Sequence, residues 1–109
     1  MCRALKVMCV AEDAVALSAL KQATVSAGWE LTPGATDDRA ALDQINTERP
    51  HVLVVFGTFP VLLRLVAERF PGMRVISDRQ ADGVTAVAAT PDEVRLLVSG
   101  MPKPSGPVG

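Results

Sequence analysis

Short runs of apolar residues alternate along the chain with longer segments in which apolar residues recur every three or four positions. Val52–Phe56 (VLVVF) is the clearest run, and Leu5–Val10 (LKVMCV) is another. Short apolar runs of this kind are typical of strands that are buried on both faces of a parallel sheet. The same criteria predict further strands at Trp29–Thr32, Met73–Ser77 and Val84–Ala88.

Four segments with helical periodicity lie between or after these strands, at about residues 14–27, 36–48, 60–70 and 90–99. Gly28 stands where the first of them should end. Thr90, Pro91 and Glu93 form the strongest start, with an N-cap threonine, a proline at the first helical position and a glutamate that closes a capping box. The alternation of strands and helices predicts an α/β sandwich of three layers, in which helices cover both faces of a mostly parallel sheet.

The connection between the last two predicted strands is unusually short. Six residues separate Ser77 from Val84, whereas a parallel crossover takes about a dozen or more. The usual helix between these strands is therefore missing, and the last strand is either reached by a tight loop or runs antiparallel at the edge. We expect this gap to leave apolar surface on the last two strands, where a second copy or another protein would dock.

The length, charge and cysteine content of the chain limit its domain number and its possible partners. The 109 residues carry a net charge of −1. They predict one domain over residues 1–100 with a flexible Pro- and Gly-rich tail at 101–109. A nucleic-acid surface concentrates Lys and Arg, which a net charge of −1 does not suggest. A membrane span needs about 20 apolar residues, and the apolar runs of this sequence are much shorter. We recognise no signal peptide, and two cysteines are too few for a disulfide framework. We expect a cytoplasmic protein with no nucleic-acid or membrane partner.

From residue 5 to about residue 99, the order of elements resembles the receiver domain of two-component response regulators. Three segments carry the resemblance: Lys6–Asp13 (KVMCVAED), Ala35–Val55 (ATDDRAALDQINTERPHVLVV) and Ala81–Val94 (ADGVTAVAATPDEV). The resemblance implies a flavodoxin-like, receiver-like sandwich of about five mostly parallel strands and about four helices. The helix between the fourth and fifth strands would be absent.

Receiver chemistry depends on groups at the carboxyl ends of parallel strands. An aspartate after the third strand takes the phosphoryl group, an acidic pair after the first strand holds Mg²⁺, and a hydroxyl and a lysine follow the fourth and fifth strands. On this resemblance the aspartate position falls on Phe56 and the lysine position on Val87. The acidic pair falls on Ala11 and Glu12, with Asp13 one place further on, and the hydroxyl position falls on Ser77. A phenyl ring cannot attack phosphorus. The resemblance therefore implies a pseudo-receiver that is no enzyme, needs no cofactor and acts in signalling or scaffolding without phosphorylation.

Several residues at these strand ends admit two interpretations. Glu12 and Asp13 are weak candidates for Mg²⁺ ligands, but capping the following helix is the simpler role. In the simpler interpretation, Phe56 fills the space of the lost carboxylate. In the other, Phe56, Phe59 and Pro60 form an apolar surface for a partner, and Val84 is a further candidate residue of that interface. Ser77 has no base beside it in the sequence and is expected to cap a loop.

Cys9 suggests an alternative function, because small phosphotransfer subunits of sugar-transport systems (the IIB class) place a nucleophilic cysteine after their first strand. That chemistry needs a loop whose N–H groups cradle phosphate. Here Glu12 and Asp13 would repel the phosphate, so a buried strand cysteine is the simpler interpretation. A small-ligand-binding domain is a further alternative, against which the lack of a Gly-rich loop counts.

The remaining polar residues are expected on the surface. His51 precedes the third strand, at the end away from the strand ends that would form the site. Solvated positions are likewise expected for Arg64, Arg69, Arg74 and Arg79.

Overall fold

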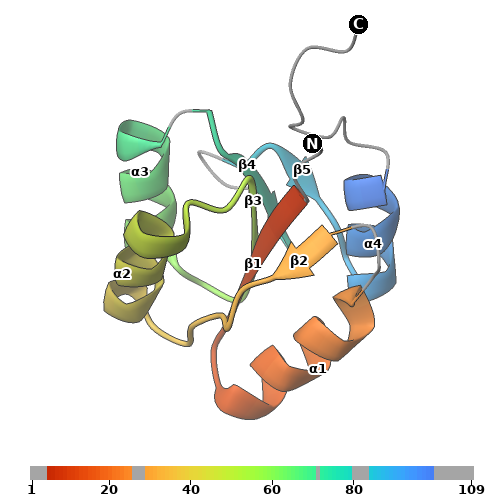
Figure 1. Cartoon of the computed structure of the whole chain (residues 1–109). Helices are drawn as coiled ribbons and strands as arrows, with labels where there is room; N and C mark the ends of the chain where they lie inside the picture. The colour runs from red at the N-terminus through yellow and green to blue at the C-terminus, as the bar shows by residue number, and fades with distance from the viewer. Residues whose placement is uncertain (1–4, 26–28, 71, 80–83, 100–109) are drawn as a thin grey trace, which may run out of the picture.

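The computed structural model describes residues 5–25, 29–70, 72–79 and 84–99. Strands and helices alternate along them as β1 (Leu5–Ala11), α1 (Ala14–Thr24), β2 (Trp29–Leu31), α2 (Asp38–Glu48), β3 (Val52–Phe56), α3 (Pro60–Arg69), β4 (Arg74–Ser77), β5 (Ala86–Val87) and α4 (Pro91–Ser99). The five strands form one sheet in the order β2-β1-β3-β4-β5, and every pair is parallel. The predicted three-layer α/β architecture is confirmed (Figure 1).

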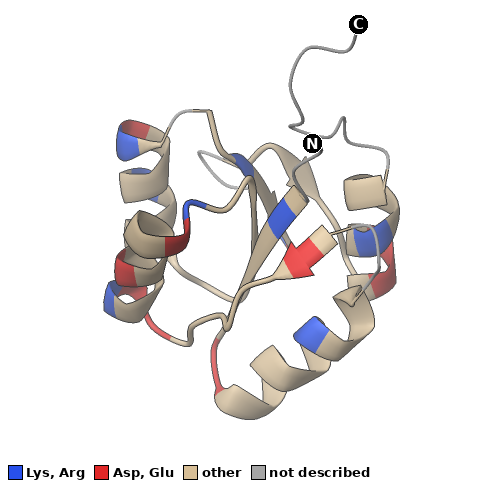
Figure 2. Cartoon of the chain, in the orientation of Figure 1, with Lys and Arg blue, Asp and Glu red and all other residues tan. Residues whose placement is uncertain are grey.

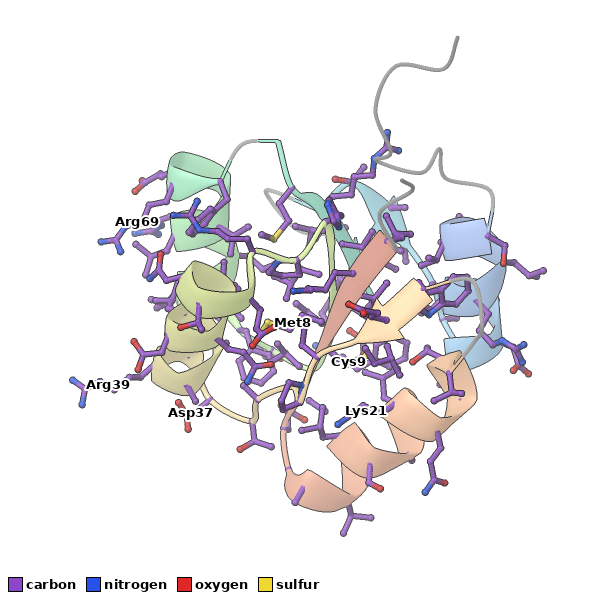
Figure 3. All side chains as sticks on the ribbon, viewed as in Figure 1. Met8, Cys9, Lys21, Asp37, Arg39 and Arg69 are labelled. Carbon is purple, nitrogen blue, oxygen red and sulfur yellow. The ribbon has the colours of Figure 1, made fainter. Side chains whose placement is uncertain are left out.

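The sheet separates two apolar clusters, because successive strand residues point to opposite faces. Met8 packs with α2 and α3 on one face, whereas its neighbour Cys9 packs with α1 and α4 on the other (Figures 1 and 3). We call these the α2/α3 cluster and the α1/α4 cluster. Burial on both faces explains why β1 and β3 read as almost continuous apolar runs. None of the described helices is long and apolar enough to cross a membrane.

The last strand runs parallel to its neighbour, which settles the choice between a tight loop and an antiparallel edge. Ile76 pairs with Ala86, and Ser77 pairs with Val87. The Ala88 N–H donates to the Ser77 carbonyl at 2.8 Å, which continues the ladder past the strand. The strand has two residues instead of the five predicted. No helix lies between β4 and β5 among the residues described there, so the predicted gap in the helical layer is confirmed.

Side chains cap the starts of α2 and α4. The Asp37 carboxylate accepts the Ala40 N–H at 2.7 Å at the start of α2. At the start of α4, the Thr90 hydroxyl accepts the Glu93 N–H at 3.3 Å, whereas the Glu93 carboxylate accepts the N–H of Ala89 rather than of Thr90. The helix α1 ends at Thr24 rather than near residue 27. The predicted cap at Gly28 and the predicted tail at 101–109 lie outside the described residues.

The sole histidine joins two strands at the amino edge of the sheet. His51 Nδ1 accepts the backbone N–H of Lys6 at 3.0 Å. The Lys6 ammonium in turn reaches the Glu48 carboxylate at 3.3 Å, which ties β1 to the end of α2. His51 is partly buried and supplies an acceptor to β1, a structural role that the predicted surface position did not include.

Candidate functional site

Neighbouring strands bring most of the predicted site positions to one edge of the sheet. Ala11 and Phe56 are register partners at the carboxyl ends of β1 and β3. Ser77, the last residue of β4, pairs with Val55 on one side and with Val87 of β5 on the other. The four strand ends therefore lie side by side, at the edge where ligands bind in open parallel sheets. We call this region the carboxyl-edge site.

Glu12 closes the gap between the ends of β1 and β3. Its exposed carboxylate accepts the backbone N–H of Thr58 at 3.4 Å. Gly57, which links Phe56 to Thr58, has a φ of 129°, a conformation that glycine adopts without strain. A Cβ at residue 57 would overlap the Glu12 side chain. The absence of a side chain at Gly57 thus lets Glu12 lie across the loop.

Asp78 and Arg79 form the second half of the carboxyl-edge site. The Asp78 carboxylate accepts the Gly57 N–H at 3.4 Å and pairs with the Arg79 guanidinium at 3.3 Å. Arg79 also donates to the Thr58 hydroxyl at 3.1 Å. The hydrogen bond to Asp78 raises the pKa of Arg79 above its ordinary value, and the negative charge of Glu12 acts in the same direction. The guanidinium therefore stays positively charged beside the Asp78 carboxylate.

This network was missed by sequence reasoning. The sequence predicts a solvated position for Arg79, as for the other arginines, and it gives no separate signal for Thr58 or Asp78. Arg79 and Thr58 are 21 residues apart and meet because β3 and β4 are neighbours. A signal was available in principle, since residues that directly follow adjacent parallel strands share one edge of the sheet.

Asp13 and Ser77 have local structural roles. The Asp13 carboxylate accepts the Ala16 N–H at 2.7 Å and caps α1, as the simpler interpretation predicted. The fully buried Ser77 hydroxyl accepts the Arg79 N–H at 3.3 Å, which confirms the predicted loop-capping role. In the part of the chain that the structure describes, neither side chain hydrogen-bonds to a base that could activate it as a nucleophile.

Phe56 and Phe59 do not form one surface. Phe56 is partly buried against the α1/α4 cluster, whereas Phe59 is a buried member of the α2/α3 cluster, on the opposite face of the sheet. Pro60 is exposed, and Val84 packs partly against the α2/α3 cluster. The predicted apolar patch of Phe56, Phe59 and Pro60 is therefore not formed, because the sheet separates its two rings.

Solved structures identify the fold. The signal receiver domain of an HD domain-containing protein from Pseudomonas fluorescens superposes with a TM-score of 0.72 at 16% identity, over 89% of this chain and 92% of that chain. A CheY-like receiver domain protein from Methanospirillum hungatei gives 0.71 at 17% identity, with the same coverage of 89% and 92%. The chain has the receiver fold. No protein-family model and no curated protein sequence matches it.

The receiver fold does not by itself fix an activity. A cobalamin-binding protein from Desulfitobacterium hafniense also superposes, with a TM-score of 0.70 at 8% identity, over 89% of this chain and 58% of that chain. At identities this low the likeness establishes architecture, and function has to be argued from the site.

The Mg²⁺ that the receiver fold implies does not fit the residues of this site. Mg²⁺ takes oxygen ligands in a near-octahedral arrangement. Here the Glu12 carboxylate is engaged by Thr58, the Asp13 carboxylate caps a helix, and the Phe56 side chain offers no oxygen. The Asp78 carboxylate, which also lies at this site, is paired with a guanidinium. Among the described residues, no three His, Cys, Asp or Glu side chains are arranged to hold a metal.

Cys9 lies away from the carboxyl-edge site. Its side chain is fully buried in the α1/α4 cluster, with Sγ 3.7 Å from the Thr24 hydroxyl. Burial raises the pKa of the Cys9 thiol to about 11, although Thr24 and the charge of Lys21 oppose the shift. A phosphocarrier cysteine needs an accessible thiolate, so the structure gives no support to the IIB alternative.

Proposed function

We propose that this chain is a receiver-like protein-interaction module in signalling or scaffolding that works without phosphorylation. The observation that carries the proposal is the placement of Phe56 and Val87 at the carboxyl ends of β3 and β5, where the receiver resemblance expects an aspartate and a lysine. Phe56 packs into the α1/α4 cluster, and Val87 offers no charge to a phosphoryl group.

The polar groups that remain at the carboxyl-edge site support this proposal, because they satisfy one another. Glu12 and Asp78 accept the N–H groups of Thr58 and Gly57. Arg79 joins Asp78 to the Thr58 hydroxyl. An incoming phosphoryl group would have to displace two carboxylates from these N–H groups, at a cost in electrostatic energy. The site is thus better suited to holding the loops in one arrangement than to switching between two.

The docking surface in this proposal lies on β5, where the helical layer is interrupted. Val87 leaves 42% of its surface exposed, and Thr85 is exposed as well. Ala86 and Ala88 pack against the α1/α4 cluster on the opposite face, so Thr85 and Val87 point to the face of α2 and α3. Val84 borders this surface. A protein partner that covers β5 would take the place of the absent helix.

Phosphotransfer is tested by incubating the protein with Mg²⁺ and acetyl phosphate, with a phosphorylatable receiver domain as the positive control. We expect intact-mass spectrometry to detect a phosphoryl adduct on the control and none on this chain. A stoichiometric, Mg²⁺-dependent adduct that maps to any residue of the carboxyl-edge site would refute the proposal.

A further inference from the structure

The outer flank of α1 differs from the other helix surfaces in its lack of charge. Lys21 is the single charged residue among its 11, whereas the sequences of α2, α3 and α4 each contain three or more. Figure 2 shows α1 almost entirely tan beside the red and blue bands of the other helices. A surface helix normally carries polar and charged residues on its solvent side. With Lys21 as its single charged residue, α1 has fewer charges than a freely solvated helix usually carries.

The same flank borders a groove. A depression of about 470 Å³ runs along α1 beside the edge strand β2 and is lined by Ala14, Leu17, Ser18, Lys21, Gln22, Val25 and Leu31. These α1 positions recur every three or four residues and so share one side of the helix. Val15 borders them with 81% of its surface exposed, and Val25 exposes 59%. The opposite flank of α1 lies against α4 (Figure 1).

The charges near the two ends of α1 indicate which charges a helix packed against this groove should carry. Asp13 is exposed at the N-terminal end of α1, just before the groove-lining residue Ala14, and Lys21 lies two turns further along the helix. A helix that runs antiparallel to α1 must therefore offer a cation near Asp13 and an anion near Lys21. The α1 of a second copy does both, because a two-fold axis between Leu17 and Ser18 places Lys21 opposite Ala14 of the second copy, next to Asp13 of that copy.

We infer that the α1 flank is a homodimer interface in which α1 packs antiparallel to its two-fold copy. Lys21 Nζ already donates to the Pro33 carbonyl at 2.8 Å, which holds its stem along the groove. An ammonium has three donors, so the bond to Pro33 is retained while the second copy's Asp13 carboxylate accepts another. Small side chains at Ala14 and Ser18 allow the two helices to approach closely.

The expected dimer is weak and sensitive to salt. The helix is about 16 Å long, so the contact is small and the dimer should form at high micromolar concentration or above. Two Asp13–Lys21 pairs at the rim of the contact should weaken as salt screens them. The α1 flank begins beside Glu12 of the carboxyl-edge site, but the dimer contact needs neither Mg²⁺ nor a phosphoryl group. Association measured without Mg²⁺ therefore tests the dimer separately from phosphotransfer.

Sedimentation equilibrium of the full chain up to about 1 mM tests the inference, with Ser18→Arg as the disrupting variant and Leu96→Arg as the matched control. Leu96 lies on α4 and exposes 73% of its surface, so its substitution adds the same charge on another helix. We expect a dimer for the wild type and for Leu96→Arg. We expect at least a tenfold loss of association for Ser18→Arg, with unchanged circular dichroism.

Asp13→Asn provides a second and milder variant, because asparagine also caps helices well but carries no charge. We expect it to dimerise several-fold more weakly than the wild type at low salt and equally well at high salt. A wild-type chain that stays monomeric up to 1 mM would overturn the inference. So would a dimer that Ser18→Arg leaves intact, or one that dissociates in Leu96→Arg instead.

Discussion

The side chain of Glu12 lies over Gly57 at the point where a Cβ would stand. The first residue after β1 and the first residue after β3 are thereby fitted to each other. The contact holds the Glu12 carboxylate beside the Thr58 N–H, and the same loop presents the Gly57 N–H to Asp78 from the other side. The two loops of the carboxyl-edge site are thus fixed by short-range packing as well as by charge.

Replacement of Gly57 by alanine should therefore destabilise the domain. A residue with a side chain is strained at a φ of 129°, and its Cβ would displace Glu12. We expect a loss of about 2 kcal/mol or more in the free energy of unfolding. Gly72→Ala is the matched control, because no atom lies within 4 Å of a Cβ there. Equal effects of the two substitutions would contradict the described fit between Gly57 and Glu12.

The unfolding free energy can be followed through Trp29, the only tryptophan in the chain. It is 8% exposed, and its indole N–H donates to the Thr24 carbonyl at 2.9 Å. Its fluorescence should therefore change when α1 and β2 separate. Urea titrations monitored by this signal serve for each stability prediction.

Gln44 should contribute to stability through the turn that follows β2. Its amide makes two hydrogen bonds with the backbone of Gly34, accepting from the N–H at 2.6 Å and donating to the carbonyl at 2.9 Å. Gln44→Ala leaves both partly buried groups without these partners, so we expect a loss of about 1–2 kcal/mol. Gln22→Ala, at an exposed position of α1, should change stability little. A Gln44→Ala variant as stable as Gln22→Ala would show that the two bonds do not form.

Asp13 should stabilise the domain as a helix cap. Asp13→Ala removes the acceptor of the Ala16 N–H and should cost about 1 kcal/mol. Asp13→Asn keeps an acceptor oxygen and should retain most of that stability. Urea denaturation with and without Mg²⁺ distinguishes capping from a role in metal binding, because Mg²⁺ should leave the curve of the wild type unshifted as well as those of the two variants. A Mg²⁺-dependent stabilisation of the wild type that is lost in both variants would instead identify Asp13 as a ligand.

Cys9 should make folding less favourable at alkaline pH. Burial raises the pKa of the folded thiol from its ordinary value of 9.0 to about 11, so the unfolded chain loses its proton first as the pH rises. The contribution of Cys9 to stability is therefore complete below the unfolded pKa and declines above it. Between pH 8 and pH 10.5 the wild type should lose about 2 kcal/mol more than Cys9→Ala does. Parallel stability curves for the two proteins would contradict the buried thiol.

The sequence was sufficient to predict the strands and most helix starts, because these depend on local signals. The apolar run at Val52–Phe56 predicts β3 with the correct bounds, and Thr90 caps α4 as expected. The gap before β5 was likewise predicted from its length. The parallel direction of β5 could not be predicted, because it depends on the backbone pairing of Ser77 with Val87.

The carboxyl-edge site was predicted only in part, because its polar contacts join residues far apart in the chain. Ser77 and Asp13 were assigned local roles that short-range patterns reveal. The role of Arg79 depends on Thr58, which belongs to a different loop. The ring positions of Phe56 and Phe59 depend on which face of the sheet each residue meets. That choice is set by the path of the loop through Gly57, which sequence periodicity does not describe.

We propose above all that the carboxyl-edge site does not bind a phosphoryl group. The most direct test records amide chemical shifts of the ¹⁵N-labelled protein during titration with Mg²⁺ and beryllofluoride, a phosphoryl analogue, with a phosphorylatable receiver as the positive control. We expect saturable shifts in the control and none in this chain at Glu12, Phe56, Gly57, Ser77 or Arg79. Saturable, Mg²⁺-dependent shifts that cluster at these residues would contradict the claim.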